Sequence, residues 1–208
     1  MKKFIISIDQ GTTSSRVILF DSKAKIVFKS QFEFKQYFPK NGWVEHNPKE
    51  IWLTTIKALK NVIKKASRLK GKIISIGITN QRETTIVWNK KTGKPVYNAI
   101  VWQDRRTEKY CNVLKKKNYE KSFRKKTGLF IDPYFSATKI KWILDNVAET
   151  KNLVKSNNLL FGTVDTYLIW KLTNGKKHLT DATNASRTML FNINNNKWDN
   201  EIIKKLKI

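Results

Sequence analysis

The chain has 208 residues, of which 40% are hydrophobic and 12% aromatic, so it contains enough apolar material for a packed core and is not a disordered tail. Its net charge of +26 suggests nucleic-acid binding, but only seven of its 42 basic residues are arginine, and the lysines are spread along the whole chain. We therefore expect no specific nucleic-acid partner. Retention on DNA at ~0.2 M salt would support that alternative.

Two further features bear on the compartment. The single cysteine, Cys111, cannot form an internal disulfide, which is typical of a reducing environment. No apolar stretch approaches the roughly 18 residues that a membrane helix needs. We therefore expect a cytoplasmic protein without a membrane span.

The first third of the chain predicts a meander of strands. Apolar runs with alternation predict strands at 4–9, 16–21 and 25–34, joined by short turns. The first turn, 10–15, is rich in glycine, threonine and serine. Antiparallel pairing of the three strands follows from these short connections.

A helix and a further strand come next. Asn47, Pro48 and Glu50 predict a capped helix start. Its predicted apolar face consists of Trp52, Ile56, Leu59, Ile63 and Ala66. Gly71 is predicted to end the helix, and the apolar run 73–79 is predicted to be a buried strand.

The rest of the chain predicts two short strands and then mostly helices. Strands are expected at 85–88 and 96–102, and helices at 105–117, from Ser136, at 164–172 and in the last residues, 198–208. This order of elements indicates a layered α/β or α+β domain.

The first candidate site is the turn after the first strand. Asp9 stands at the strand end, followed by Gly11, Thr12, Thr13, Ser14 and then Arg16. Hydroxyls and N–H groups in a glycine-containing turn can hold phosphate oxygens, and a carboxylate can reach Mg²⁺. The spacing is not that of a Walker A loop. An ordinary hairpin turn remains the alternative.

The second candidate site follows the apolar run 73–79. Arg82 and Glu83 place five donors and two strong acceptors next to each other, a set that suits the hydroxyls of a polyol. In α/β sheets, ligands gather at the carboxyl ends of strands. A surface ion pair is the alternative.

Two aromatic residues complete the candidates. Tyr134 precedes a helix that Ser136 is expected to cap, so its hydroxyl is free to face a cleft. Trp102 ends a strand and either lies against a small ligand or fills the core. Trp142 is expected to pack in the core. Asp165, Asp181 and Arg187 are interpreted as residues that hydrogen-bond between elements.

Taken together, these motifs resemble the glycerol kinases of the FGGY family of carbohydrate kinases. The resemblance runs in order along nearly the whole chain, through 9–16 (DQGTTSSR), 42–46 (GWVEH), 77–88 (GITNQRETTIVW), 98–102 (NAIVW), 132–143 (DPYFSATKIKWI), 161–171 (FGTVDTYLIWK) and 183–191 (TNASRTMLF). It implies an actin-like, ribonuclease-H-like ATPase fold in which a mixed sheet is flanked by helices.

The resemblance also implies an activity and a role for each candidate residue. The activity is transfer of the γ-phosphoryl group of ATP, with Mg²⁺, to a terminal hydroxyl of glycerol, giving sn-glycerol 3-phosphate. Arg82, Glu83 and Tyr134 would bind the glycerol hydroxyls and Trp102 its carbon side. Thr12, Thr13 and Ser14 would approach the nucleotide phosphates, Arg16 would offset charge, and Asp9 would place the metal.

The resemblance covers less than a whole kinase. Glycerol kinases are longer, and their carboxylate base lies in a segment that would follow Ile208. We therefore expect residues 1–208 to be the amino-terminal domain without the second ATPase domain, and to have little activity alone. Homo-oligomers of the full-length form are compatible with the resemblance. A kinase for another polyol or sugar, such as xylulose or erythritol, and a non-catalytic fragment that binds glycerol or nucleotide remain alternatives.

Overall fold

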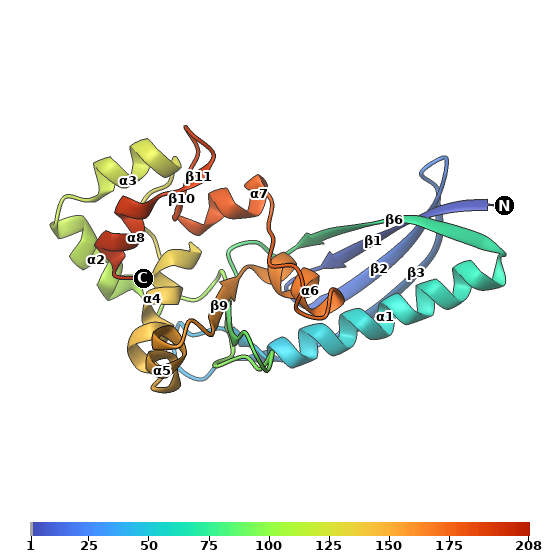
Figure 1. Ribbon diagram of the computed structural model, residues 1–208, viewed down its shortest axis with the longest axis horizontal. Helices are drawn as coiled ribbons and strands as arrows, with labels where there is room; N and C mark the ends of the chain where they lie inside the picture. Colours follow the sequence, from blue (N-terminus) through green and yellow to red (C-terminus); the bar gives the residue numbers. More distant parts are fainter. Residues whose placement is uncertain (1) are drawn as a thin grey trace. The chain divides into compact units, whose positions relative to one another are not determined.

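The computed structural model describes residues 2–208 and divides into two units (Figure 1). The first unit contains residues 2–36 and Asn47–Gln81, and the second contains Tyr37–His46 and Arg82–Ile208. Among the described residues, every helix is too short or too polar to traverse a lipid bilayer.

The first unit is built on a mixed sheet. Its strands are β1 (Lys2–Gln10), β2 (Ser14–Asp21), β3 (Ile26–Glu33) and β6 (Gly71–Asn80), in the order β3-β2-β1-β6. The predicted antiparallel meander of β1, β2 and β3 is confirmed, whereas β6 runs parallel to β1. Because β1 and β6 are parallel, their carboxyl ends meet, and Gln10 pairs with Asn80 at the same edge of the sheet.

Helix α1 (Pro48–Arg68) makes the crossover between β3 and β6 and covers one face of the sheet (Figure 1). The predicted cap is confirmed, since the side chain of Asn47 accepts a hydrogen bond from the Lys49 N–H at 2.9 Å. The predicted apolar face is wrong in part, because only Leu59 and Ala66 of that set are buried. The buried face consists of Pro48, Ile51, Thr55, Ala58, Leu59, Val62 and Ala66.

Gly71 is required for close packing and does not end α1. The left-handed residue after the helix is Lys70, with φ 52°, and Gly71 already belongs to β6. A Cβ atom on Gly71 would lie 2.0 Å from Cε2 of Phe4. A side chain at position 71 would therefore displace the Phe4 ring from the core of the first unit.

Strand β6 is an edge strand, so its predicted burial is wrong. Ile74 and Ile76 are 53% and 45% exposed. Within residues 2–208, β1 is the only strand that pairs with β6. Apolar side chains of β6 therefore form a surface that the described residues cover only in part.

The second unit combines small sheets with short helices. Its sheets are β4-β5-β8, β7-β9 and β10-β11, formed by β4 (Gln36–Tyr37), β5 (Glu45–His46), β7 (Ile86–Asn89), β8 (Ala99–Ile100), β9 (Leu159–Gly162), β10 (Phe191–Asn192) and β11 (Lys197–Trp198). Its helices are α2 (Glu108–Lys116), α3 (Glu120–Thr127), α4 (Ser136–Asn146), α5 (Glu149–Lys155), α6 (Val164–Leu172), α7 (Ala182–Ala185) and α8 (Asn200–Leu206).

The predicted elements of the second unit are confirmed in type but not always in length. Helix α6 has the predicted bounds, and α4 begins at Ser136 as expected. The helix expected at 105–117 begins at Glu108, and the strand expected at 96–102 is reduced to β8. Residues from α2, α3, α4 and α8 share one core, in which Phe123 and Leu206 are fully buried.

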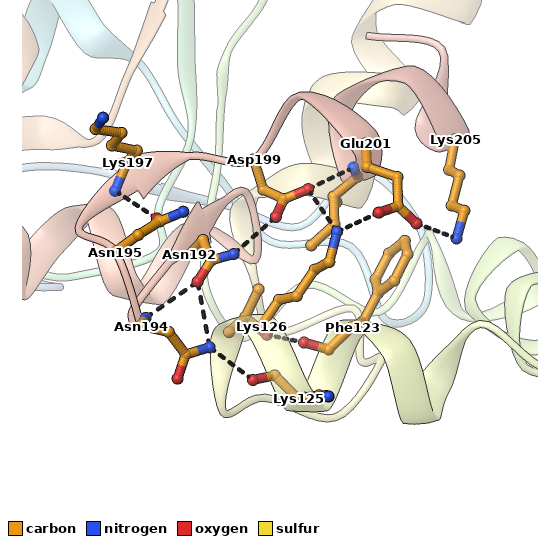
Figure 2. Close-up of polar contacts among 12 residues, drawn as sticks. Phe123, Lys125, Lys126, Asn192, Asn194, Asn195, Lys197, Asp199, Glu201 and Lys205 are labelled. Atoms are coloured by element: carbon orange, nitrogen blue, oxygen red, sulfur yellow. Dashed lines mark hydrogen bonds and ion pairs between the residues drawn. The ribbon is translucent and has the colours of Figure 1, made fainter.

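A polar cluster ties α8 to α3 (Figure 2). Asp199 caps α8 by accepting a hydrogen bond from the Ile202 N–H at 3.0 Å, and it also accepts from Asn192 at 2.9 Å. Lys126 of α3 forms ion pairs with both Asp199 and Glu201. Ion pairs with Lys126 therefore stabilise the position of α8, in addition to the packing of its buried side chains.

Acid should loosen this helix. Partial burial raises the pKa of Asp199, but hydrogen bonds from the Ile202 N–H, Asn192 and Lys126 lower it overall, and hydrogen bonds from Lys126 and Lys205 lower the pKa of Glu201. Groups with a lowered pKa stabilise the fold above their unfolded pKa of about 4, and this contribution is lost as the pH falls through the folded pKa.

Deuterium exchange of residues 200–207, corrected for the intrinsic pH dependence, should therefore accelerate between about pH 5 and 3. Asp199→Asn is the matched variant, because asparagine also caps helices but carries no charge. We expect a smaller acceleration in this variant, and an equal one would contradict the assignment.

Candidate functional site

The turn between β1 and β2 presents polar groups at the carboxyl end of β1. Thr13 is exposed, and Thr12 and Ser14 are half-buried. The hydroxyl of Ser14 accepts a hydrogen bond from the Gln31 amide at 2.8 Å. The turn thus places the three predicted phosphate-binding residues consecutively at the edge of the sheet.

The carbonyl oxygens of residues 11–14 all accept hydrogen bonds from other groups of the first unit. The Gly11 carbonyl accepts from Gln81 at 3.1 Å, and the Thr12 carbonyl accepts from Gln36 at 2.9 Å. The carbonyls of Thr13 and Ser14 accept from backbone N–H groups of residues 34 and 11. Carbonyl oxygens repel phosphate, so their engagement favours an anion at this turn.

The backbone at Gly11 has no conformation that only glycine can adopt. Gly11 does not have a left-handed φ, and a Cβ atom there would lie 3.4 Å from the Ser14 carbonyl oxygen, an ordinary contact.

Asp9 and Arg16 face each other across β1 and β2. The Arg16 guanidinium donates to the Asp9 carboxylate from two nitrogens, Nε at 3.2 Å and Nη2. The pair is partly exposed, with 32% of the Asp9 side chain and 43% of the Arg16 side chain accessible. Mg²⁺ commonly takes one or two carboxylates together with phosphate oxygens and water, so one accessible carboxylate beside the turn fits this ion.

Glu83 occupies a strained turn in the second unit. Its φ is 62°, in the left-handed region, and the Thr84 N–H donates to the Arg82 carbonyl at 2.7 Å across it. This is a three-residue γ-turn of the rare, strained kind. The Glu83 side chain is 2% exposed. A buried carboxylate in a strained turn is typical of a functional site.

Arg187 neutralises this carboxylate. Its Nε donates to Glu83 Oε1 at 2.6 Å, and its guanidinium lies 5.0 Å from the centroid of the Phe135 ring and 5.7 Å from that of Tyr134. The interpretation of Arg187 as a residue that bonds between elements is confirmed. Its partner was not predicted, because 104 residues separate the two in sequence.

The start of α4 contacts the backbone of the Glu83 turn. Ser136 Oγ donates to the Glu83 carbonyl at 3.0 Å. The predicted capping role of Ser136 is wrong, because Phe135 is the N-cap residue and Ser136 is the first residue of the helix. Lys139 donates to the carbonyls of Glu83 and Tyr134, at 3.3 and 2.6 Å. Helix α4 therefore positions both residues.

Trp102 and Tyr134 lie together. Their ring centroids are 5.5 Å apart, and the backbone N–H of Trp102 donates to the Thr84 hydroxyl at 3.3 Å, beside the Glu83 turn. Both aromatic side chains are half-buried, so each keeps an accessible edge. The structure brings Glu83, Trp102 and Tyr134 together, and their role in binding a ligand stays a prediction.

Arg82 is placed differently. Its side chain is exposed, and within residues 2–208 its guanidinium forms no hydrogen bond or ion pair. Its neighbour Glu83 is anchored, so Arg82 is free to reorient towards a ligand. Its participation stays a prediction.

A buried arginine supports the loop that carries Trp102. Arg106 is fully buried and forms ion pairs with Asp104 at 2.8 Å and Glu45 at 2.7 Å. Asp104 also accepts from the Val44 N–H at 2.7 Å. Trp142 is partly buried, lies 5.2 Å from Trp43 between ring centroids and flanks a small core that includes Ile143, in agreement with the expected packing. The loop after β8 is thus fixed by a charged core and not by apolar packing alone.

The two remaining acidic candidates have structural partners. Asp165 accepts hydrogen bonds from Thr163 and Thr180, and burial raises the pKa of its carboxyl. Asp181 caps α7 by accepting from the Asn184 N–H at 2.7 Å. The bond from Thr180 to Asp165 agrees with the interpretation that this residue bonds between elements, whereas Asp181 makes a local cap of its own helix.

Comparisons with known proteins identify one family. Residues 4–208 match the profile of the FGGY family of carbohydrate kinases, N-terminal domain. Over its whole length the chain is 57% identical to glycerol kinase of Petrotoga mobilis and 59% identical to glycerol kinase of Thermoanaerobacter sp. strain X514, and it covers 42% of each.

Solved structures give the same picture. Plasmodium falciparum glycerol kinase with ADP superposes with a TM-score of 0.93 and 40% identity, over 99% of this chain and 41% of that one. Gluconate kinase of Lactobacillus acidophilus superposes with a TM-score of 0.86 and 26% identity, over 100% of this chain and 40% of that one. The chain therefore spans about two fifths of the length of these relatives.

Proposed function

Because the chain belongs to the FGGY family of carbohydrate kinases, we propose that it forms the glycerol site and the phosphate-binding turn of a glycerol kinase. Its fold is the actin-like, ribonuclease-H-like fold of these kinases, with the mixed sheet β3-β2-β1-β6 at its centre. The proposal depends on one observation above all: the Glu83 carboxylate is buried and paired with Arg187, whose guanidinium lies 5.7 Å from the centroid of the Tyr134 ring that packs against Trp102.

The chemistry of this cluster suits glycerol. The Glu83 carboxylate accepts hydrogen bonds from hydroxyls, whereas the exposed Arg82 guanidinium donates to them. The Tyr134 phenol both donates and accepts. The Trp102 ring offers an apolar surface for the carbon chain. Together Arg82, Glu83 and Tyr134 can form hydrogen bonds with every hydroxyl of a small triol at once, which favours the triol over water.

The β1–β2 turn would serve the nucleotide. Thr12, Thr13 and Ser14 would bind the phosphates of ATP or ADP, and Arg16 would offset the charge on the transferred group. Asp9 would hold Mg²⁺, which neutralises the phosphate oxygens when bound. Phosphoryl transfer depends mainly on positioning and charge neutralisation, so these residues would align the phosphate chain. The substrate proton needs a carboxylate base, which we assign to none of residues 1–208.

Titration calorimetry on the purified 208-residue chain tests the proposal. We expect heat with glycerol and a weaker response with xylulose and erythritol, and separate binding of Mg-ADP. Equal or tighter binding of the larger substrates would favour the other sugar kinases, and no binding of glycerol would overturn the proposal. A steady-state assay with Mg-ATP and glycerol should show little turnover. Robust turnover would place the base within residues 1–208.

A further inference from the structure

Lys139 is a fully buried lysine beside the polyol-binding cluster of Glu83, Trp102 and Tyr134. Its side chain is 0% exposed, on the face of α4 that packs in the second unit. Within residues 2–208, no carboxylate lies close enough to form an ion pair with it. Burial of a lysine without an acidic partner is costly, so the position needs a reason other than packing.

The amine of Lys139 joins two residues of the cluster. Its Nζ lies 2.6 Å from the Tyr134 carbonyl oxygen and 3.3 Å from the Glu83 carbonyl oxygen. Glu83 and Tyr134 are 51 positions apart in the chain, and Nζ is one point that bonds both. No apolar side chain of similar length could make this link.

The hydrogen bond from Lys139 to the Glu83 carbonyl supports a strained backbone conformation. A non-glycine residue held at a left-handed φ, such as Glu83 at 62°, is strained and persists only when its surroundings fix it. The Glu83 carbonyl is fixed by Ser136 and by Lys139, and both donors come from the first turns of α4. Loss of one donor would let the turn relax towards ordinary φ values.

We propose that Lys139 is a positioning residue, whose amine holds the Glu83 turn and the Tyr134 backbone together so that the carboxylate and the phenol meet a polyol at a fixed separation. This inference rests on the proposed function for the identity of the ligand. The positioning itself concerns only residues of the second unit.

Titration of the Lys139 amine makes the free energy of unfolding depend on pH. Burial lowers its pKa to about 7, against the opposing influence of Glu83, Asp104 and Asp132, while Arg106 lowers it further. The folded pKa is therefore below the unfolded value of about 10.4, so the unfolded chain binds more protons between these values. This group makes the free energy of unfolding rise with pH from about 7 to 10, and a Lys139→Met variant should lack that contribution.

The test compares three variants in the 208-residue chain. Lys139→Met keeps an unbranched side chain, one bond shorter than that of lysine, but removes every donor. Lys139→Gln is equally short but keeps an amide with two N–H donors at its end, so it can restore part of the link to the two carbonyls. Lys141→Met is the control, because Lys141 lies on the same helix and pairs at the surface with Asp145. The readouts are deuterium exchange without ligand and the Kd values for glycerol and Mg-ADP.

We expect Lys139→Met to accelerate exchange in residues 82–85 and 132–136, to raise the glycerol Kd about tenfold or more, and to leave the Mg-ADP Kd unchanged. Lys139→Gln should lie between this variant and wild type, and Lys141→Met should match wild type. Wild-type exchange in the two segments, or wild-type glycerol affinity, in a folded Lys139 variant would overturn the inference.

The two proposals fail differently. If wild type does not bind glycerol, the proposed function fails, and the exchange in residues 82–85 and 132–136 still decides the role of Lys139. If Lys139→Met does not fold, Lys139→Gln takes its place, and wild-type exchange in that variant overturns the inference.

Discussion

Replacing Arg106 with alanine is expected to lower the free energy of unfolding by about 3–5 kcal/mol. The Arg106 side chain is fully buried and lies between the carboxylates of Asp104 and Glu45, which are 1% and 3% exposed. Burial opposes its charge, but hydrogen bonds with Asp104 and Glu45 raise its pKa above the ordinary value. Alanine would leave two buried carboxylates without a cation and remove the guanidinium that lies 3.8 Å from the Trp43 ring centroid.

The neighbouring residue supplies the control. Arg105 is 45% exposed at its side chain and pairs with Glu108 and Asp132 at the surface, so Arg105→Ala should cost no more than about 1 kcal/mol. Urea unfolding followed by near-UV circular dichroism measures both. Equal effects of the two alanine variants would refute the ion-paired core.

The sequence predicted the elements whose signal is local. Alternating apolar residues were enough for β1, β2 and β3, and α6 has its predicted bounds. The apolar periodicity of α1 did not identify its buried face, because the helix has apolar side chains on two adjacent faces. Packing against the sheet determines that Ile51 and Val62 face inwards. The burial of β6 was mispredicted because apolar composition does not reveal which strand lies at an edge.

The candidate site was predicted residue by residue but not as a network. Glu83, Trp102 and Tyr134 stood out because each follows or precedes a recognisable element. The partnership of Arg187 with Glu83 had no local signal, since it depends on how α7 and the residues after it fold back. Lys139 looks like any other lysine in a chain rich in lysine, and only its 0% exposure separates it from the solvated ones. Long-range contacts of charged groups are decided by tertiary structure, which spacing along the chain does not encode.

Glu83→Gln is expected to weaken glycerol binding by about 10- to 150-fold. Hydrogen bonds to charged groups contribute about 1.5–3 kcal/mol, which converts to this range of Kd. Glutamine has the same size, and the bonds from Ser136 and Lys139 go to the backbone carbonyl, so the turn should persist. The loss therefore reports the charge of the side chain. Calorimetric titration with glycerol measures it, with Glu108→Gln, which changes an exposed acid of the same unit, as the control.

A double-variant comparison of Arg187 and Glu83 tests the role of the Glu83 carboxylate more strictly. Arg187 reaches the polyol-binding cluster through its bond to the Glu83 carboxylate, so Arg187→Met should also raise the glycerol Kd. If it acts through that carboxylate, its effect should largely vanish in the Glu83→Gln background, because residues that share one interaction do not contribute additively. Additive losses in the double variant would mean that Arg187 contacts the ligand independently, and a Glu83→Gln variant with wild-type affinity would remove the carboxylate from the site altogether.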